Sequence, residues 1–168
     1  FIYFAAKAIA GDEPNGNGEY FPWSELQKSL SFFVGRNLFL NHNSQDPRNA
    51  IGKVLDAYPI VDEATGEKYI ECLAKIDAVQ NPELARHLST GILDAVSMGC
   101  SVESSTCSIC GHMIHTEQDQ KCFHMSKGLL KEYLAEQDLK DFNIKRGERL
   151  QAYAINQGLN FTELSVVN

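Results

Sequence analysis

The fold is decided by residues 50–77, which read AIGKVLDAYPIVDEATGEKYIECLAKID. Two long apolar runs, residues 50–61 and 68–77, flank a short polar segment that ends at Gly66. Runs rich in β-branched and aromatic residues favour strands, and a short connection with a glycine favours a hairpin. This stretch therefore predicts two long antiparallel strands joined by a turn at residues 62–66.

Outside this hairpin, the chain contains more strand-like than helical segments. Three helices are predicted: from Ser24 to about Gly35, from the capping residue Asn81 to Gly91, and from about Ser126 to Leu139. The remaining predicted strands are residues 3–9, 37–41, 93–103, 151–155 and 161–167. Many strands, few helices and no βαβ alternation predict a mainly β fold with peripheral helices, in which an antiparallel sheet closes into a barrel.

Composition limits the classes of partner. The 168 residues predict a single domain, and the formal charge of -7 without a basic stripe argues against a nucleic-acid partner. No apolar run is long enough to cross a bilayer, so no membrane partner is expected, and no signal peptide is recognised. The chain lacks an initiator Met and both ends lie in apolar runs, which suggests a piece of a longer protein. The expected partners are proteins; the chain is compatible with a homo-oligomer, and its sequence fixes no oligomeric state.

The clearest chemical signal is a group of cysteines. Three of the five cysteines fall in one short stretch, which suggests metal ligation in a reducing compartment. A C-x2-C knuckle followed by glycine can hold one ion with two thiolates, and a later Cys and His can complete a tetrahedral site. We predict a structural Zn²⁺ site in an insertion at about residues 105–125, with His112 or His115 as substitutes for the histidine. The predicted ligands are Cys107, Cys110, Cys122 and His124.

Two residues could form a nucleophile and a general base. Alternation along residues 95–103 places Ser97 on a face of small residues, where a peptide could approach its hydroxyl. His42 ends an apolar run before a turn, a position from which an imidazole can reach a neighbouring serine. Taken one at a time, an ordinary strand serine and a surface histidine are the commoner interpretations.

Four stretches taken together resemble the ordered signature of the prohead proteases of tailed phages and, more distantly, of the herpesvirus assemblins. They are residues 40–43, 51–55, 91–99 and 161–167. In both groups a histidine at a strand end precedes an Ile/Val-Gly strand, a Ser-x-Gly strand supplies the nucleophile, and a later strand supplies a third member. The resemblance covers residues 37–104 and resumes near residue 161.

The resemblance implies a closed seven-stranded barrel with the function of a serine endopeptidase. Ser97 would be the nucleophile and His42 the general base. The implied substrates are scaffold and major capsid precursor proteins, cleaved during procapsid maturation inside the immature head, in the host cytoplasm. Assemblins also use arginines just after the third member's strand to build the oxyanion hole, and this chain has none there, so the oxyanion donors are unassigned.

The third catalytic member is assigned to Glu163. Alternation in residues 161–167 places it on one face with Phe161 and Ser165, so that an acid interrupts what would otherwise be a buried strand and needs a partner. The same stretch resembles the assemblin strand that carries the third member, a histidine in that family. Asp77, which ends a strand before a helix, is the second candidate, and a surface glutamate on an edge strand is the plain alternative.

Other classes of protein remain open from the sequence. The main alternative is a non-enzymatic, zinc-stabilised binding module of a virion, in which His42 and Ser97 have no catalytic role. A zinc hydrolase fits less well, because catalytic zinc keeps one position open and usually has His and carboxylate ligands.

Overall fold

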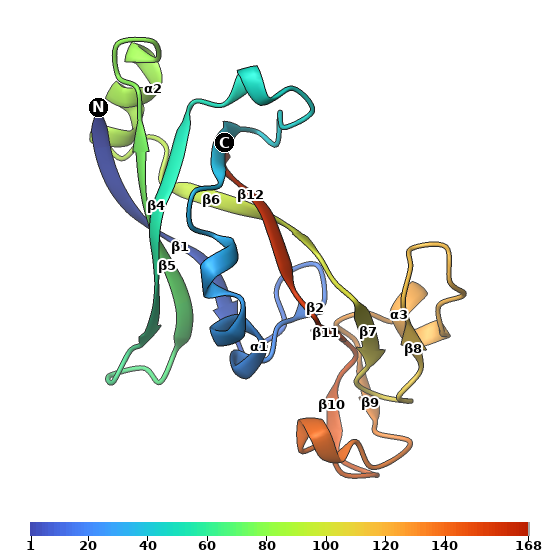
Figure 1. Cartoon of the computed structure of the whole chain (residues 1–168). Helices are drawn as coiled ribbons and strands as arrows, with labels where there is room; N and C mark the ends of the chain where they lie inside the picture. The colour runs from blue at the N-terminus through green and yellow to red at the C-terminus, as the bar shows by residue number, and fades with distance from the viewer. Residues whose placement is uncertain (168) are drawn as a thin grey trace. The chain divides into compact units, whose positions relative to one another are not determined.

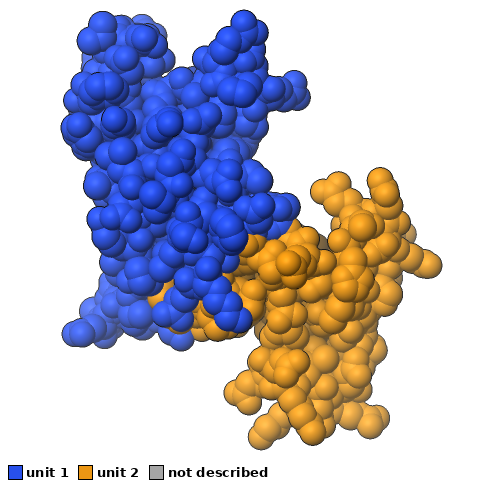
Figure 2. All heavy atoms as spheres, viewed as in Figure 1, with its two compact units in different colours: residues 1–11, 26–101, 160–168 blue, residues 12–25, 102–159 orange. Residues whose placement is uncertain are grey.

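A computed structural model of the chain describes residues 1–167. Strands hold 41% of the residues and helices 16%, which confirms the mainly β prediction. The chain forms two compact units, each built from separate segments of sequence and coloured blue and orange in Figure 2. The first unit contains residues 1–11, residues 26–101 and the chain from residue 160 onward, and the second contains residues 12–25 and 102–159.

A six-stranded sheet forms the first unit and curls into a half-barrel (Figure 1). Its order is β1-β5-β4-β3-β12-β6, so β1 and β6 are the end strands. All neighbouring strands are antiparallel except β3 and β12, which run parallel. The expectation of a wholly antiparallel sheet is therefore wrong at this pair; the long chain between the two strands leaves their relative direction free, unlike a hairpin turn. The strands are β1 (Ile2–Gly11), β3 (Asn37–Leu40), β4 (Gly52–Val61), β5 (Lys68–Ile76), β6 (Ala95–Ser101) and β12 (Asn160–Val167).

The predicted hairpin is confirmed by β4 and β5. The two strands pair from Gly52 opposite Ile76 to Val61 opposite Lys68. Gly66 closes the turn with a φ of 74°, a conformation in which glycine is favoured because it has no Cβ.

The helices agree with the sequence in part. α2 (Pro82–Ser89) follows Asn81 as predicted, and Gly91 has the expected left-handed conformation with a φ of 70°. The first helix is shorter than predicted, because α1 (Trp23–Lys28) gives way to the 3-10 turn η1 (Leu30–Phe32). A second 3-10 turn, η2 (Pro47–Asn49), follows β3. No helix within residues 1–167 combines the length and apolar character that a membrane span requires.

The third predicted helix is wrong. α3 (Phe123–Ser126) is a single turn, and the chain beyond it forms strand β9 (Glu132–Leu134). Leu130 has a φ of 66°, which ends any helix there, and Tyr133 and Leu134 differ in exposure as strand neighbours do. Tyr133 and Leu134, which the prediction placed in a helix, therefore belong to a strand.

Two small sheets build the second unit. The first has the order β2-β11-β7-β8 and the second pairs β10 with β9. The predicted strand 151–155 is split between β10 and β11, and the insertion expected at about residues 105–125 lies within this larger unit. The elements are β2 (Glu19–Tyr20), β7 (Ser104–Cys107), β8 (Met113–Ile114), the 3-10 turn η3 (Lys140–Phe142), β10 (Arg149–Gln151) and β11 (Ala154–Gln157).

Gly52 provides a test of the first sheet. A Cβ at this position would overlap the carbonyl oxygen of Lys75 on the neighbouring strand, and backbone cannot move aside as a side chain can. Gly52→Ala should lower the free energy of unfolding by about 1–3 kcal/mol. The measurement is urea unfolding followed by circular dichroism. Gly16→Ala is the control, because a Cβ there meets no atom within 4 Å. Equal stability of the two variants would contradict the register of β4 and β5.

Candidate active site and metal centre

A tight turn at the end of β3 carries His42. The Asn43 N–H donates to the carbonyl of Leu40 at 3.1 Å, and the two central residues, Asn41 and His42, have φ angles of 49° and 58°. Left-handed conformations at both central positions define a type I′ turn. Such a conformation costs about 1–2 kcal/mol for most residues, although asparagine tolerates it well. The turn therefore holds the histidine in a costly backbone conformation.

His42 is bonded to the predicted third member. Its Nδ1 lies 2.6 Å from Oε1 of Glu163. The side chain of His42 is 46% exposed, whereas that of Glu163 is only 8% exposed. The second carboxylate oxygen, Oε2, accepts a hydrogen bond from the hydroxyl of Ser165 at 2.5 Å. Burying a carboxylate costs several kcal/mol unless it is paired and hydrogen-bonded, and here both oxygens have partners.

A bulge in β12 sets which residues share the face of Glu163. Phe161 pairs with Cys100 and Glu163 pairs with Gly99, so Thr162 is the extra residue. The extra residue changes the alternation, and Phe161 stacks on Phe33 in the core with ring centroids 3.9 Å apart. The prediction that Glu163 and Phe161 lie on the same face of the strand is therefore wrong, whereas Glu163 and Ser165 lie on the same face, as predicted.

Ser97 reaches this cluster through strand pairing. It lies on β6, half-buried, directly opposite Ser165 of β12. Residues opposite each other on antiparallel strands point their side chains to the same face. The Ser165 hydroxyl also accepts the backbone N–H of His42 at 3.2 Å. Ser97 is thus paired with the residue that binds both other members of the predicted triad.

No hydrogen bond joins Ser97 to His42 within residues 1–167. Such bonds are often long in enzymes without substrate and shorten in the complex. Nδ1 of His42 is engaged by Glu163, and no hydrogen bond to Nε2 is found in the described part of the chain. Nε2 is the nitrogen that remains for a hydroxyl proton.

Gly99 leaves the space that the Glu163 carboxylate occupies. A Cβ at this position would lie 2.8 Å from both Cγ and Oε1 of Glu163 and 2.9 Å from Oγ1 of Thr162. These distances are shorter than side chains tolerate, so a larger residue would displace the acid. Sequence reasoning missed this role, although the face shared by Ser97 and Gly99 was the signal for it.

The second candidate acid is engaged elsewhere. Oδ1 of Asp77 accepts the backbone N–H groups of Val79 and Gln80 at 2.9 and 3.1 Å, in the turn before α2. This is the ordinary use of an aspartate at a turn. Of the two acids, the structure brings Glu163 to His42.

A pocket of about 340 Å³ opens beside Glu163. Arg36, Asn37, Phe39 and Thr162 are among its other lining residues, and all of them belong to the first unit. The acid therefore lies next to a hollow in the surface. Sequence reasoning gave no indication of Arg36 or Asn37.

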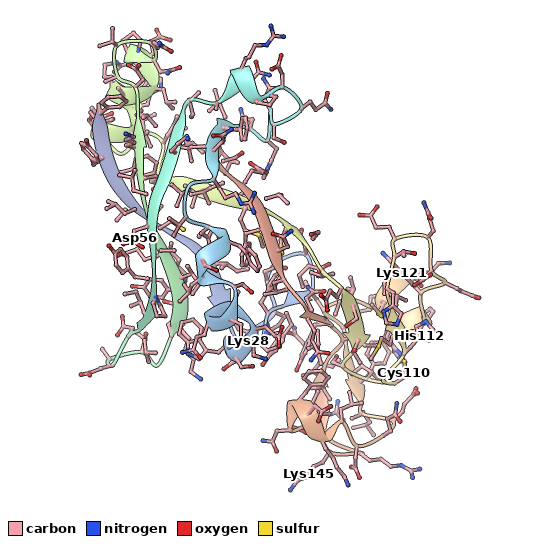
Figure 3. The ribbon with its side chains drawn as sticks, in the orientation of Figure 1. Lys28, Asp56, Cys110, His112, Lys121 and Lys145 are labelled. Atoms are coloured by element: carbon pink, nitrogen blue, oxygen red, sulfur yellow. The ribbon has the colours of Figure 1, made fainter. Side chains whose placement is uncertain are left out.

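The four predicted metal ligands come together in the second unit. One ligand atom from each of Cys107, Cys110, Cys122 and His124 lies within 4.8 Å of the others. Cys107 ends β7, and the Gly111 N–H donates to its carbonyl at 3.0 Å, which closes the knuckle around Cys110. Cys110 and the neighbouring His112 are labelled in Figure 3. Cys122 precedes α3 and His124 lies within it, so the two halves of the set come from two separate local structures.

The environment of His124 fits a metal ligand. Its Nδ1 is buried and, within the described residues, has no hydrogen-bond partner, whereas its Nε2 lies 3.7 Å from Oε1 of Glu136. A buried nitrogen without a partner requires an explanation, and metal-bound histidines commonly present their other nitrogen to a carboxylate. The alternatives fit less well, since Nε2 of His112 bonds to the Gln120 carbonyl at 2.6 Å and His115 is exposed.

Burial affects the thiols of this group. It raises the pKa of Cys107 to about 12 and raises the pKa of Cys110 as well. Without a cation these thiols are protonated and unreactive at neutral pH, and zinc would bind by displacing their protons. Three thiols and one imidazole can form a closed tetrahedral site of the structural kind, which leaves no position for substrate.

Comparisons with known proteins give no match among family models, curated proteins or solved structures.

The cysteine cluster predicts that the reduced protein binds one zinc ion. The four ligands lie in a short stretch with few apolar residues, so removal of the metal should increase hydrogen exchange in residues 104–135 more than in the first unit. Native mass spectrometry measures the stoichiometry and exchange mass spectrometry the local effect. Cys110→Ala should lose the ion, whereas Cys100→Ala, outside the set, should retain it. A reduced parent protein without bound metal would contradict the site.

Proposed function

We propose that this chain is a serine endopeptidase with Ser97 as nucleophile, His42 as general base and Glu163 as the third member. The observation that carries the proposal is the 2.6 Å bond between Nδ1 of His42 and the nearly buried Glu163 carboxylate. A general base needs a partner on one nitrogen, which fixes its tautomer and stabilises the imidazolium that forms during attack.

The geometry supports a separate chemical role for each of the three residues. Glu163 accepts the Nδ1–H of neutral His42, which leaves the Nε2 lone pair for the hydroxyl of Ser97. As the Ser97 oxygen bonds to the peptide carbonyl carbon, its proton passes to Nε2. The imidazolium then gives that proton to the leaving amine, and water repeats the sequence on the acyl enzyme. The half-exposed imidazole is bonded to Glu163, which lines a surface pocket, and this arrangement is compatible with access of a peptide.

The order of motifs supports a biological setting for this activity. The resemblance to tailed-phage prohead proteases suggests scaffold and major capsid precursor proteins as substrates, within the procapsid in the host cytoplasm. We propose that the curled sheet of the first unit corresponds to the closed barrel of that family and of the assemblins. The zinc site would stabilise the second unit and take no part in the reaction.

The metal-ligand cluster is also compatible with a second candidate function. The Cys3His cluster would serve equally in a zinc-stabilised virion binding module without enzymatic activity. Such a module has no need for an acid bonded to a strained histidine turn. Labelling with a fluorophosphonate separates the two functions, because only an activated serine reacts.

Removal of the nucleophile or the base should abolish cleavage. Ser97→Ala and His42→Ala should each reduce cleavage of a mixed peptide library to background, as read by mass spectrometry, while the fold persists because both side chains lie outside the core. Fluorophosphonate labelling should occur at Ser97 alone. Ser101→Ala is the matched control, an exposed serine on the same face of β6. Cleavage at the parental rate by either of the first two variants rules out this mechanism.

Loss of the charge on the third member should slow the reaction. Glu163→Gln keeps the shape of the side chain, and by analogy with the aspartate of a serine-protease triad kcat should fall by up to ~10⁴-fold. The control is Asp77→Asn, which should retain near-parental turnover because Asp77 binds its own turn. Near-parental turnover in Glu163→Gln, together with slow turnover in Asp77→Asn, would assign the third catalytic member to Asp77.

A further inference from the structure

We propose that Ser165 is a positioning residue that holds the carboxylate of Glu163 and the backbone of His42 in place and so fixes the tautomer of His42. The inference rests on the proposed function for its catalytic consequence, but its physical content concerns only these three residues. Ser165 has no exposed surface in the structure.

One hydroxyl makes both contacts. The Ser165 O–H donates to Oε2 of Glu163 at 2.5 Å, and the same oxygen accepts the backbone N–H of His42 at 3.2 Å. The two bonds run in opposite senses, so a side chain here must donate and accept at once, as a hydroxyl does. Ser165 thus joins the acid to the turn that carries the base.

The backbone around Ser165 makes this position rigid. Its strand lies between β3 and β6, with Ser165 paired to Phe39 on one side and to Ser97 on the other. A residue paired on both sides has little backbone freedom, and its two hydrogen bonds hold the hydroxyl beside Glu163.

The Ser165 hydroxyl is the hydrogen-bond donor found for Oε2 of Glu163 within the described residues. Gly99, opposite Glu163, has no side chain to confine Oε1. Without the Ser165 hydroxyl, Oε2 would be buried with no donor, and rotation of the carboxylate would give up the bond to Nδ1. A free imidazole favours the Nε2–H tautomer, which has no lone pair at the nitrogen that must accept the Ser97 proton.

Direct attack by Ser165 is excluded by its burial. A nucleophile must meet the substrate carbonyl, whereas this hydroxyl is covered on all sides and donates its hydrogen to the acid. Its effect passes through Glu163 and His42, so it is a positioning residue and not a catalytic one.

The test is nitrogen NMR of protein labelled with ¹⁵N-histidine, recorded at a pH where His42 is neutral, beside peptide cleavage. The parent should show His42 as the Nδ1–H tautomer. Ser165→Ala and the near-isosteric Ser165→Cys, whose thiol is a weak donor, should shift it toward Nε2–H, and kcat should fall by about 10²-fold with little change in KM. Ser165→Thr keeps the hydroxyl and should restore both the Nδ1–H tautomer of His42 and the parental kcat. Ser101→Ala is the control.

The outcomes separate this inference from the proposed function. If the parent protein cleaves no peptide but the His42 tautomer shifts in the Ala and Cys variants, the positioning role is supported and the proposed protease function is excluded. The parental tautomer in both variants overturns the positioning role whatever the activity. If the Ala variant does not fold, the Cys variant decides, and failure of Ser165→Thr to restore the Nδ1–H tautomer also counts against the role of the hydroxyl.

Discussion

The carboxylate of Glu163 is the group on which the polar cluster of the first unit, formed with His42 and Ser165, depends. Glu163 lies on a strand whose other face carries Leu164 and Val166 in the core, and its own side chain is only 8% exposed. A buried carboxylate must be satisfied where it is. Ser165 supplies one partner from the same strand and His42 supplies the other, while Gly99 supplies the space. The strained turn after β3 is the means by which an imidazole reaches an acid on the parallel neighbour of its strand.

The second unit has a different source of stability. Its strands are two to four residues long, and a cluster of six buried residues, among them Cys107 and Met125, packs around the cysteines. Short strands and a small core give little stability of their own. Four ligand atoms within 4.8 Å of one another offer a site where bound zinc could contribute the missing free energy. Burial of the thiols, which raises the pKa of Cys107 to about 12, suits a closed structural site better than a reactive cysteine.

The sequence allowed the local features of this fold to be predicted and failed where distant segments meet. The β4–β5 hairpin and α2 have their signals in adjacent residues, and so have Cys107 and Cys110 at knuckle spacing. The parallel pairing of β3 with β12 has no local signal, because more than a hundred residues separate the two strands. Because of the bulge at Thr162, Phe161 lies on the opposite face of β12 from the predicted one, since one extra residue shifts the two-residue alternation of side chains along a strand. Glu163 was predicted because it interrupts a strand expected to be buried, whereas the role of Gly99 is defined only by strand pairing and packing.

Folding alone does not account for the polar cluster of the first unit. Apolar residues of similar volume can replace a buried polar network and often stabilise a protein, so a sheet that carried Val or Leu at positions 163 and 165 would lose nothing as a sheet. The chain instead carries a buried acid, and it places a histidine in a left-handed turn beside that acid. Strain of this kind and departures from the apolar pattern concentrate at functional sites. The two costs occur at residues bonded to each other, which argues for a single cause. The base proposed for proton transfer to and from Ser97 would use both the buried acid and the strained turn.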